Sequence, residues 1–131
     1  MAHEPQECFF DHEKLDVYRE SISFVSWLAS ILESAIRLGE IKDQIERASS
    51  SISLNIAEGN GRFSHKDRGK FFEISLSSAF ECAACLDVMV ARSKLTRDAA
   101  SPGKTSLQKI VRMLVGLLKS IEARNYPSPS Q

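Results

Sequence analysis

The segment from Phe71 to Ala91 constrains the fold most, because 15 of its 21 residues are hydrophobic. Its charged side chains, Glu73, Glu81 and Asp87, fall within roughly a third of the circumference at the 100° per residue of an α-helix. A helix that packs on one neighbour needs an apolar stripe only about 100° wide. The sequence therefore predicts a helix over residues 65–93 that contacts neighbours on several sides, in its own subunit and in another.

Two further helices are predicted before this segment, where apolar residues recur at spacings of three and four. One is expected over residues 14–37, with Gly39 as its stop, and the next over residues 40–58, with a break that begins at Gly59. Glycine suits such breaks because it adopts the left-handed backbone conformation at little cost.

The same spacing predicts a last helix near the C-terminus. A loop is expected over residues 96–104, in which Ser101 and Pro102 suit the cap and the first position of that helix. Gly116 disfavours the helix by about 1 kcal/mol relative to alanine, and a close helix contact would be a reason for it. At the start of helix 65–93, the Ser64 hydroxyl is expected to cap the free backbone amides. Asp67, three residues later, is expected to answer this cap and to oppose the positive end of the helix dipole.

These four segments have short connections and no competing strand-like alternation, so the predicted fold is all-α, an antiparallel up-down-up-down four-helix bundle. A length of 131 residues fits a single domain over residues 1–131. Its ordered core is expected over about residues 12–123, and residues 125–131 are expected to form a flexible tail.

Charge is balanced over the whole chain but unevenly distributed along it. Seventeen basic residues match seventeen acidic ones, whereas residues 1–46 hold ten acids and four bases and residues 92–131 hold two acids and eight bases. This polarity would suit head-to-tail self-association or a basic face for a partner. The acidic N-terminus, the absence of a long uncharged stretch and the three cysteines predict a reduced protein of the cytoplasm, outside the membrane.

A polar ridge is predicted along helix 40–58. Two interpretations are open: a site for a ligand or partner, and an interhelical hydrogen-bond network that fixes the register of two helices, which is the favoured one because buried polar groups need partners. The ridge consists of Arg47, Ser51, Asn55 and Glu58, and Ser78 and Glu81 can approach it from the next helix.

A basic patch is predicted around the start of helix 65–93. Such a patch would bind nucleic acid through phosphate contacts and a stacking ring, supplied by Phe63. The alternative is a solvated helix surface. The candidate residues are Arg62, Lys66, Arg68 and Lys70, with Lys109 and Arg112 added by the last helix.

No metal, cofactor or catalytic site is expected. Cys82 and Cys85 share a helical face, and Cys8 with His12 would complete a set of zinc ligands, but structural zinc pairs usually lie on turns. No serine or cysteine stands with a histidine and an acid in a local catalytic signature, so the chain is not expected to be an enzyme.

One stretch of the sequence resembles a known family. It comprises Ser51-Ile-Ser-Leu-Asn-Ile-Ala-Glu-Gly59, then Gly61-Arg-Phe-Ser64, then Phe71-Phe-Glu-Ile-Ser-Leu-Ser-Ser-Ala-Phe-Glu81. These residues are similar to the four-helix bundle proteins encoded in intervening sequences of bacterial 23S rRNA genes. The resemblance implies an antiparallel bundle without enzymatic activity, commonly a ring-shaped homopentamer. It also implies kinship with the accessory variability determinant of diversity-generating retroelements, which binds a reverse transcriptase and nucleic acid through a basic surface.

The sequence thus predicts a non-enzymatic, homo-oligomeric helical scaffold or interaction protein. Helix 65–93 and parts of the first helix are the expected subunit contacts, and Phe80 is the best candidate anchor because it falls on the polar side of its helix. The alternative hypothesis is an accessory protein that binds nucleic acid through its basic surface. The candidate interface residues are Phe72, Leu76 and Phe80.

Overall fold

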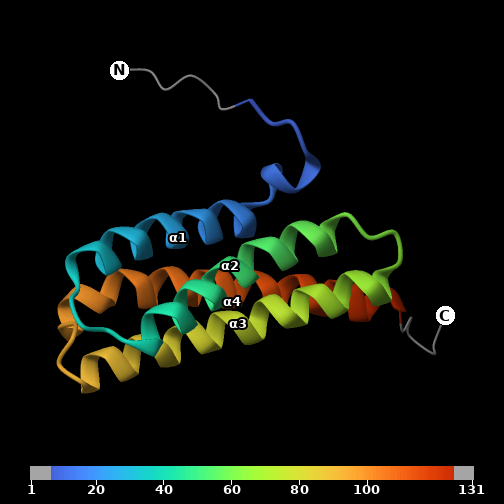
Figure 1. Cartoon of the computed structure of the whole chain (residues 1–131). Coiled ribbons are helices and arrows are strands. Elements are labelled where there is room, and N and C mark those ends of the chain that lie inside the picture. The colour runs from blue at the N-terminus through green and yellow to red at the C-terminus, as the bar shows by residue number, and fades with distance from the viewer. Residues whose placement is uncertain (1–6, 126–131) are drawn as a thin grey trace.

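Successive helices of the chain run in opposite directions. The structure is a computed structural model that describes residues 7–125, within which there is no strand. Figure 1 shows the antiparallel course, which confirms the predicted up-down-up-down four-helix bundle. The predicted tail over residues 125–131 lies outside the described residues, apart from the last helical position. The elements are a short 3-10 helix, η1 (Asp11–Lys14), and the α-helices α1 (Asp16–Ser34), α2 (Glu40–Asn60), α3 (His65–Ala91) and α4 (Arg97–Asn125).

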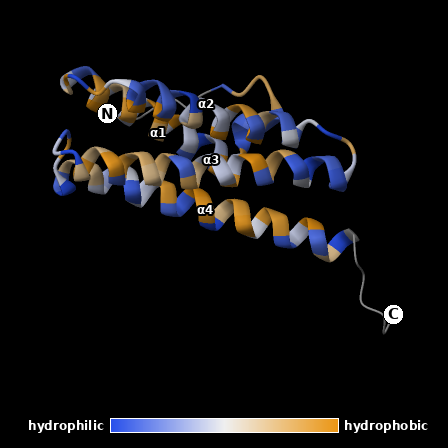
Figure 2. Cartoon of the chain, turned by 60° about the horizontal axis from the view of Figure 1, so that its bottom comes forward, coloured by the Kyte–Doolittle hydropathy of each residue, from blue (hydrophilic) through white to orange (hydrophobic). Residues whose placement is uncertain are grey.

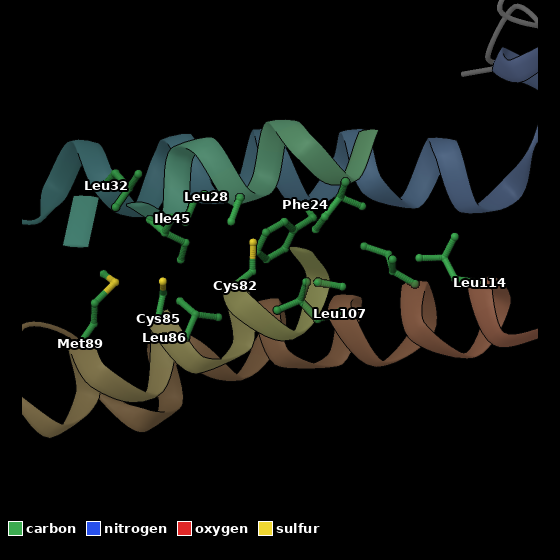
Figure 3. Packing of buried hydrophobic residues seen from close by; sticks show 14 of the residues in the cluster. Phe24, Leu28, Leu32, Ile45, Cys82, Cys85, Leu86, Met89, Leu107 and Leu114 are labelled. Carbon is green, nitrogen blue, oxygen red and sulfur yellow. The ribbon is translucent and has the colours of Figure 1, made fainter. Parts of the chain in front are cut away.

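The helices are arranged around the bundle axis in chain order. α1 and α3 each pack on both α2 and α4, and the most extensive pairings are α2 with α3 and α3 with α4. α4 diverges from α3 toward its C-terminus (Figure 2). Each helix sends large apolar side chains into one shared core, as Figure 3 shows. The core includes Phe24 and Leu28 of α1, Ile45 and Ile52 of α2, Leu86 and Met89 of α3, and Leu107 and Leu114 of α4.

α3 packs on two neighbouring helices of its own subunit, α2 and α4, as its composition predicted. Its residues Phe72, Ala79 and Leu86 are fully buried between α2 and α4. By length and composition alone α3 could cross a membrane, since an 18-residue window has a mean hydropathy of 1.6, with 39% of that window buried. The core helix of a soluble bundle passes the same test, so this is weak evidence for a membrane span.

α1 is shorter than predicted. It ends at Ser34, and the extended backbone of Ala35 stops the helix before the predicted position 37. The reason is tertiary: Leu38 is 7% exposed and joins the core, which draws the chain away from the helix axis. Arg37 and Gly39 take positive φ angles of 56° and 68° in this connection, so Gly39 precedes α2 and does not directly end α1.

α4 begins earlier than predicted, at Arg97, and the expected loop over residues 96–104 is wrong. Thr96 starts the helix, because its Oγ1 accepts a hydrogen bond of 3.0 Å from the backbone N–H of Ala99. Pro102 therefore lies inside the helix. The carbonyl left without a donor belongs to exposed Asp98 in the first turn, where water can bind it.

The glycines that permit close helix contact are not the one that the sequence suggested. Gly116 is exposed, with nothing within 4 Å of the place a Cβ would occupy, so the predicted close contact there is wrong. A Cβ at Gly103 would instead lie 2.3 Å from Trp27 Cζ3, and one at Gly59 would lie 2.9 Å from Phe72 Cε1. These two glycines bring α4 onto α1 and α2 onto α3.

Candidate interaction surfaces

The contact between α2 and α3 contains part of the predicted polar ridge. Ser78 Oγ donates a hydrogen bond of 2.8 Å to Ser51 Oγ across the two helices. Asn55 Nδ2 donates to the carbonyl oxygen of Ser51 at 2.8 Å and to its Oγ at 3.0 Å. All three side chains are half-buried or buried, so the Ser78–Ser51 bond links α2 to α3 where water has limited access, while the two Asn55 bonds stay within α2.

The other three predicted members of the ridge make different contacts. Arg47 Nε donates to the carbonyl of Asp43 at 3.4 Å, and Glu81 accepts a bond of 3.4 Å from Gln44 Nε2. Glu58 forms an exposed ion pair of 3.5 Å with Arg62. The six residues therefore do not form one hydrogen-bonded network, although Arg47, Ser51, Ser78 and Glu81 line one shallow groove of about 340 Å³ between α2 and α3.

Three buried serines that the sequence did not single out complete the polar links between helices. Ser75 Oγ of α3 donates to the carbonyl of Ile52 on α2 at 2.9 Å. Ser53 Oγ of α2 donates to Ser21 Oγ of α1 at 2.9 Å, and Ser21 Oγ donates to the carbonyl of Tyr18 at 2.6 Å. Their only signal in the sequence is a small polar residue at a position where the helix period calls for an apolar one.

Two of the predicted nucleic-acid ligands are held by contacts within the subunit. Arg68 Nη1 donates to the carbonyl of Asn60 at 2.9 Å, and its guanidinium lies 5.9 Å from the centre of the Phe72 ring. Arg62 lies 4.6 Å from the ring centre of Phe71 and pairs with Glu58. Both side chains thus brace the connection between α2 and α3.

Lys66 and Lys70 are exposed beside a groove of about 440 Å³ between α3 and α4. The floor of this α3–α4 groove consists of Gly69, Leu118 and Ile121, and its remaining lining residues are His65, Glu73 and Glu122. The other two predicted ligands, Lys109 and Arg112, are exposed on α4 outside the groove. The structure therefore distributes the predicted basic patch over three places.

The predicted interface residues differ in exposure. Phe72 is fully buried against Gly59 of α2, so the expectation that it contacts another subunit is wrong. Leu76 is half-buried against the core, whereas Phe80 is 56% exposed. Two more large apolar side chains, Leu54 of α2 at 68% and Ile74 of α3 at 46%, are also exposed.

The cysteines lie in two separate environments. Cys82 and Cys85 are buried in the core, and Cys8 is exposed near the N-terminus. Burial, followed by the neighbouring Cys85 and Glu81, raises the pKa of the Cys82 thiol to about 12, so the thiolate that would attack or bind a metal is disfavoured. Across residues 7–125, no group of three or more His, Cys, Asp or Glu side chains is placed to hold a metal ion.

Comparisons with known proteins agree with the fold. The sequence matches the profile of a family described as the 23S rRNA-intervening sequence protein over residues 13–116. The fold is similar to that of a protein of unknown function from the S23 ribosomal protein family of Bacteroides thetaiotaomicron, whose crystal structure was determined at 1.70 Å. The TM-score is 0.74 at 23% identity, and the match covers 79% of this chain and 98% of that one. Among curated proteins, none matches the sequence.

Proposed function

Because the chain belongs to the 23S rRNA-intervening sequence protein family, we propose that it is a non-enzymatic helical scaffold that assembles with copies of itself in the cytoplasm. The observation that carries this proposal is the exposed ring of Phe80 on α3, at 56%. Ile74 of the same helix is 46% exposed. Burying such side chains against another subunit is favourable by about 25 cal/mol per Å² of apolar surface.

The distribution of charge also supports self-assembly. α4 has six basic and two acidic residues, whereas α1 has three acidic and one basic. Lys109 and Arg112 of α4 and Glu33 of α1 are exposed. When a basic face of one copy meets an acidic face of the next, the contact is head-to-tail, and it forms a ring if the rotation closes. A pentamer, as the sequence resemblance implies, is one such ring.

Light scattering coupled to size exclusion, at micromolar concentration, tests this assembly. We expect the wild-type chain to elute as an oligomer and Phe80→Ser to shift the population toward smaller species. Phe63→Ser is the matched control, because Phe63 is 104% exposed but lies in the connection between α2 and α3. A monomeric wild-type protein would refute the proposal, and equal effects of the two variants would remove Phe80 as the anchor.

Nucleic-acid binding is the second candidate function. The observation that favours it is the fully exposed ring of Phe63 next to Arg62, together with the exposed Lys109 and Arg112 on α4. A flat ring can stack on a base while cationic side chains contact phosphates, and copies in a ring would add their modest contributions. The kinship with the accessory variability determinant, implied by the sequence resemblance, points the same way.

Fluorescence anisotropy with a labelled single-stranded RNA tests this second function. Binding should weaken steeply with salt, and the double variant Lys109→Gln, Arg112→Gln should reduce it and lower the salt dependence. Lys42→Gln is the matched control, because Lys42 is an exposed lysine of α2, away from α4. The absence of binding at low salt would exclude this function without affecting the scaffold proposal.

A further inference from the structure

The N-terminal arm, residues 7–15, presents two aromatic rings to solvent. Phe9 is 78% exposed and Phe10 is 68% exposed. Acidic residues surround them, since Glu7 precedes the pair and Asp11 follows it. Large exposed apolar side chains rimmed by polar ones are typical of an interaction surface.

The backbone of this arm is nevertheless held in one conformation. Glu13 Oε2 accepts hydrogen bonds from the backbone N–H groups of Phe9, at 2.8 Å, and of Phe10. Arg19 Nε donates to the carbonyl of Glu13 at 2.9 Å, and Asn60 Nδ2 donates to Asp11 Oδ2 at 3.0 Å. The backbone that carries the rings is therefore preorganised, and the Phe10 ring stacks on His12 with ring centres 5.9 Å apart, which reduces the entropy lost when the arm binds a partner.

The α3–α4 groove offers a matching surface. A Cβ at Gly69 would lie 3.9 Å from Ile121 Cγ2 and 4.0 Å from Leu118 Cδ2, in ordinary van der Waals contact, so a methyl group fits this apolar floor whereas a larger side chain would fill the groove. Lys66 and Lys70 stand beside this floor together with Glu73 and Glu122, and neither lysine forms an ion pair with any residue from 7 to 125, so both remain available to a carboxylate of another copy. The volume of about 440 Å³ falls within the range of small ligand pockets, about 300 to 1,000 Å³.

The arm and the groove lie at the same end of the bundle but on opposite sides. The Asn60–Asp11 bond fixes the arm where α2 ends, beside α1, and the groove lies where α3 begins and α4 ends. Figure 1 shows η1 at the start of α1, and the C-terminal end of α4 at the same end of the bundle but apart from η1. In a ring whose axis runs parallel to the helices, the arm of one copy is level with the groove of the next.

We propose that Phe9 and Phe10 of one copy dock in the α3–α4 groove of the neighbouring copy. The rings cover Leu118 and Ile121, and the carboxylate of Glu7 lies near Lys66 or Lys70 of that copy. This inference rests on the proposed self-assembly and names the segment that carries it. The arm cannot satisfy its own groove, because its anchors to Asn60 and Arg19 hold it on the α1–α2 side.

Cysteine crosslinking between co-expressed chains tests the docking directly. One chain keeps its native, exposed Cys8 and both docking rings, and the other carries Lys70→Cys with Cys8→Ser, while the native Cys82 and Cys85 stay buried. A short bis-maleimide should yield at least about tenfold more crosslinked dimer than with the control partner Lys42→Cys, because docking raises the effective concentration of the two thiols. Lys42 is equally suited to modification, since it is an exposed residue of α2.

The outcomes separate this inference from the scaffold proposal. If light scattering gives an oligomer but the Lys70 pairing crosslinks no more than the Lys42 control, the arm does not dock in the groove and the scaffold proposal stands. If the wild-type chain is a monomer, both fall.

Filling the groove gives a second, independent readout. Gly69→Leu should raise the protein concentration needed for assembly at least about tenfold, whereas Gly69→Ala leaves the floor open and should change it little. Circular dichroism establishes that both variants fold. Equal assembly by folded Gly69→Leu and Gly69→Ala would contradict the docking.

Discussion

The contact between Trp27 and Gly103 allows a sharp test of how α4 packs on α1. A Cβ at position 103 would lie 2.3 Å from Trp27 Cζ3 and 2.4 Å from Cη2, well inside the roughly 3.5 Å at which carbon atoms touch. The indole ring stacks on Phe24, with ring centres 5.7 Å apart. Gly103→Ala must therefore displace the indole from Phe24 or push the two helices apart.

Two opposing terms set the size of the effect. Overpacking a core destabilises by about 1 to 3 kcal/mol, whereas alanine favours a helix over glycine by about 1 kcal/mol. The free energy of unfolding of Gly103→Ala should therefore fall by about 0 to 2 kcal/mol. Gly116→Ala is the matched control, because Gly116 is in the same helix with open space around it, and it should gain about 1 kcal/mol. The difference between the two variants, about 1 to 3 kcal/mol, is free of the propensity term.

Urea unfolding followed by circular dichroism, at one protein concentration, measures both variants. The chain has a single tryptophan, so its fluorescence reports on Trp27 alone, and Gly103→Ala should shift the emission toward that of a more solvated indole. If Gly103→Ala gains as much stability as Gly116→Ala and the emission of Trp27 is unchanged, residue 103 does not pack against the indole and the prediction is refuted.

Three other predictions follow from the buried contacts. Ser78→Ala should destabilise the fold by about 1 kcal/mol, because its hydroxyl bonds that of Ser51. In the Ser78→Ala background, Ser51→Ala should therefore cost less stability than it costs in the wild-type protein; strictly additive costs in this double-mutant cycle would argue against the bond. Leu38→Ala should cost about 2 to 4 kcal/mol because this side chain is 7% exposed, whereas Ile36→Ala, at 75% exposed, should leave the urea midpoint nearly unchanged. The thiol of Cys82 has a pKa of about 12 when folded and an ordinary value of 9.0, so the unfolded chain loses this proton first. Its contribution to stability is full below pH 9 and declines as pH rises toward 12, by at most about 1.4 kcal/mol per pH unit. Cys82→Ala should flatten the alkaline decline of the melting temperature, and an identical slope in both proteins would contradict it.

The sequence alone determined the number of α-helices, their type and their antiparallel order. These features depend on the spacing of apolar residues and on breaks within a few positions, which are local. The Ser64 cap was predictable for the same reason, since Ser64 Oγ accepts a bond of 3.1 Å from the N–H of Asp67, three residues away. The polar pair on α2, Ser51 and Asn55, was also identifiable, because both bonds of Asn55 stay within its own helix.

Packing between helices decided what the sequence could not. The sequence placed Phe80 on the polar side of its helix, where it is 56% exposed, but only the positions of α2 and α4 decide that Phe72, expected at the same interface, is fully buried. Ser101 and Pro102 suggested a helix start after a loop, but α4 begins at Arg97 and continues through both, and the indole of Trp27 fills the space above Gly103. Local spacing says which residues share a helix face, and only the neighbouring helices determine whether that face meets the core, another copy or water.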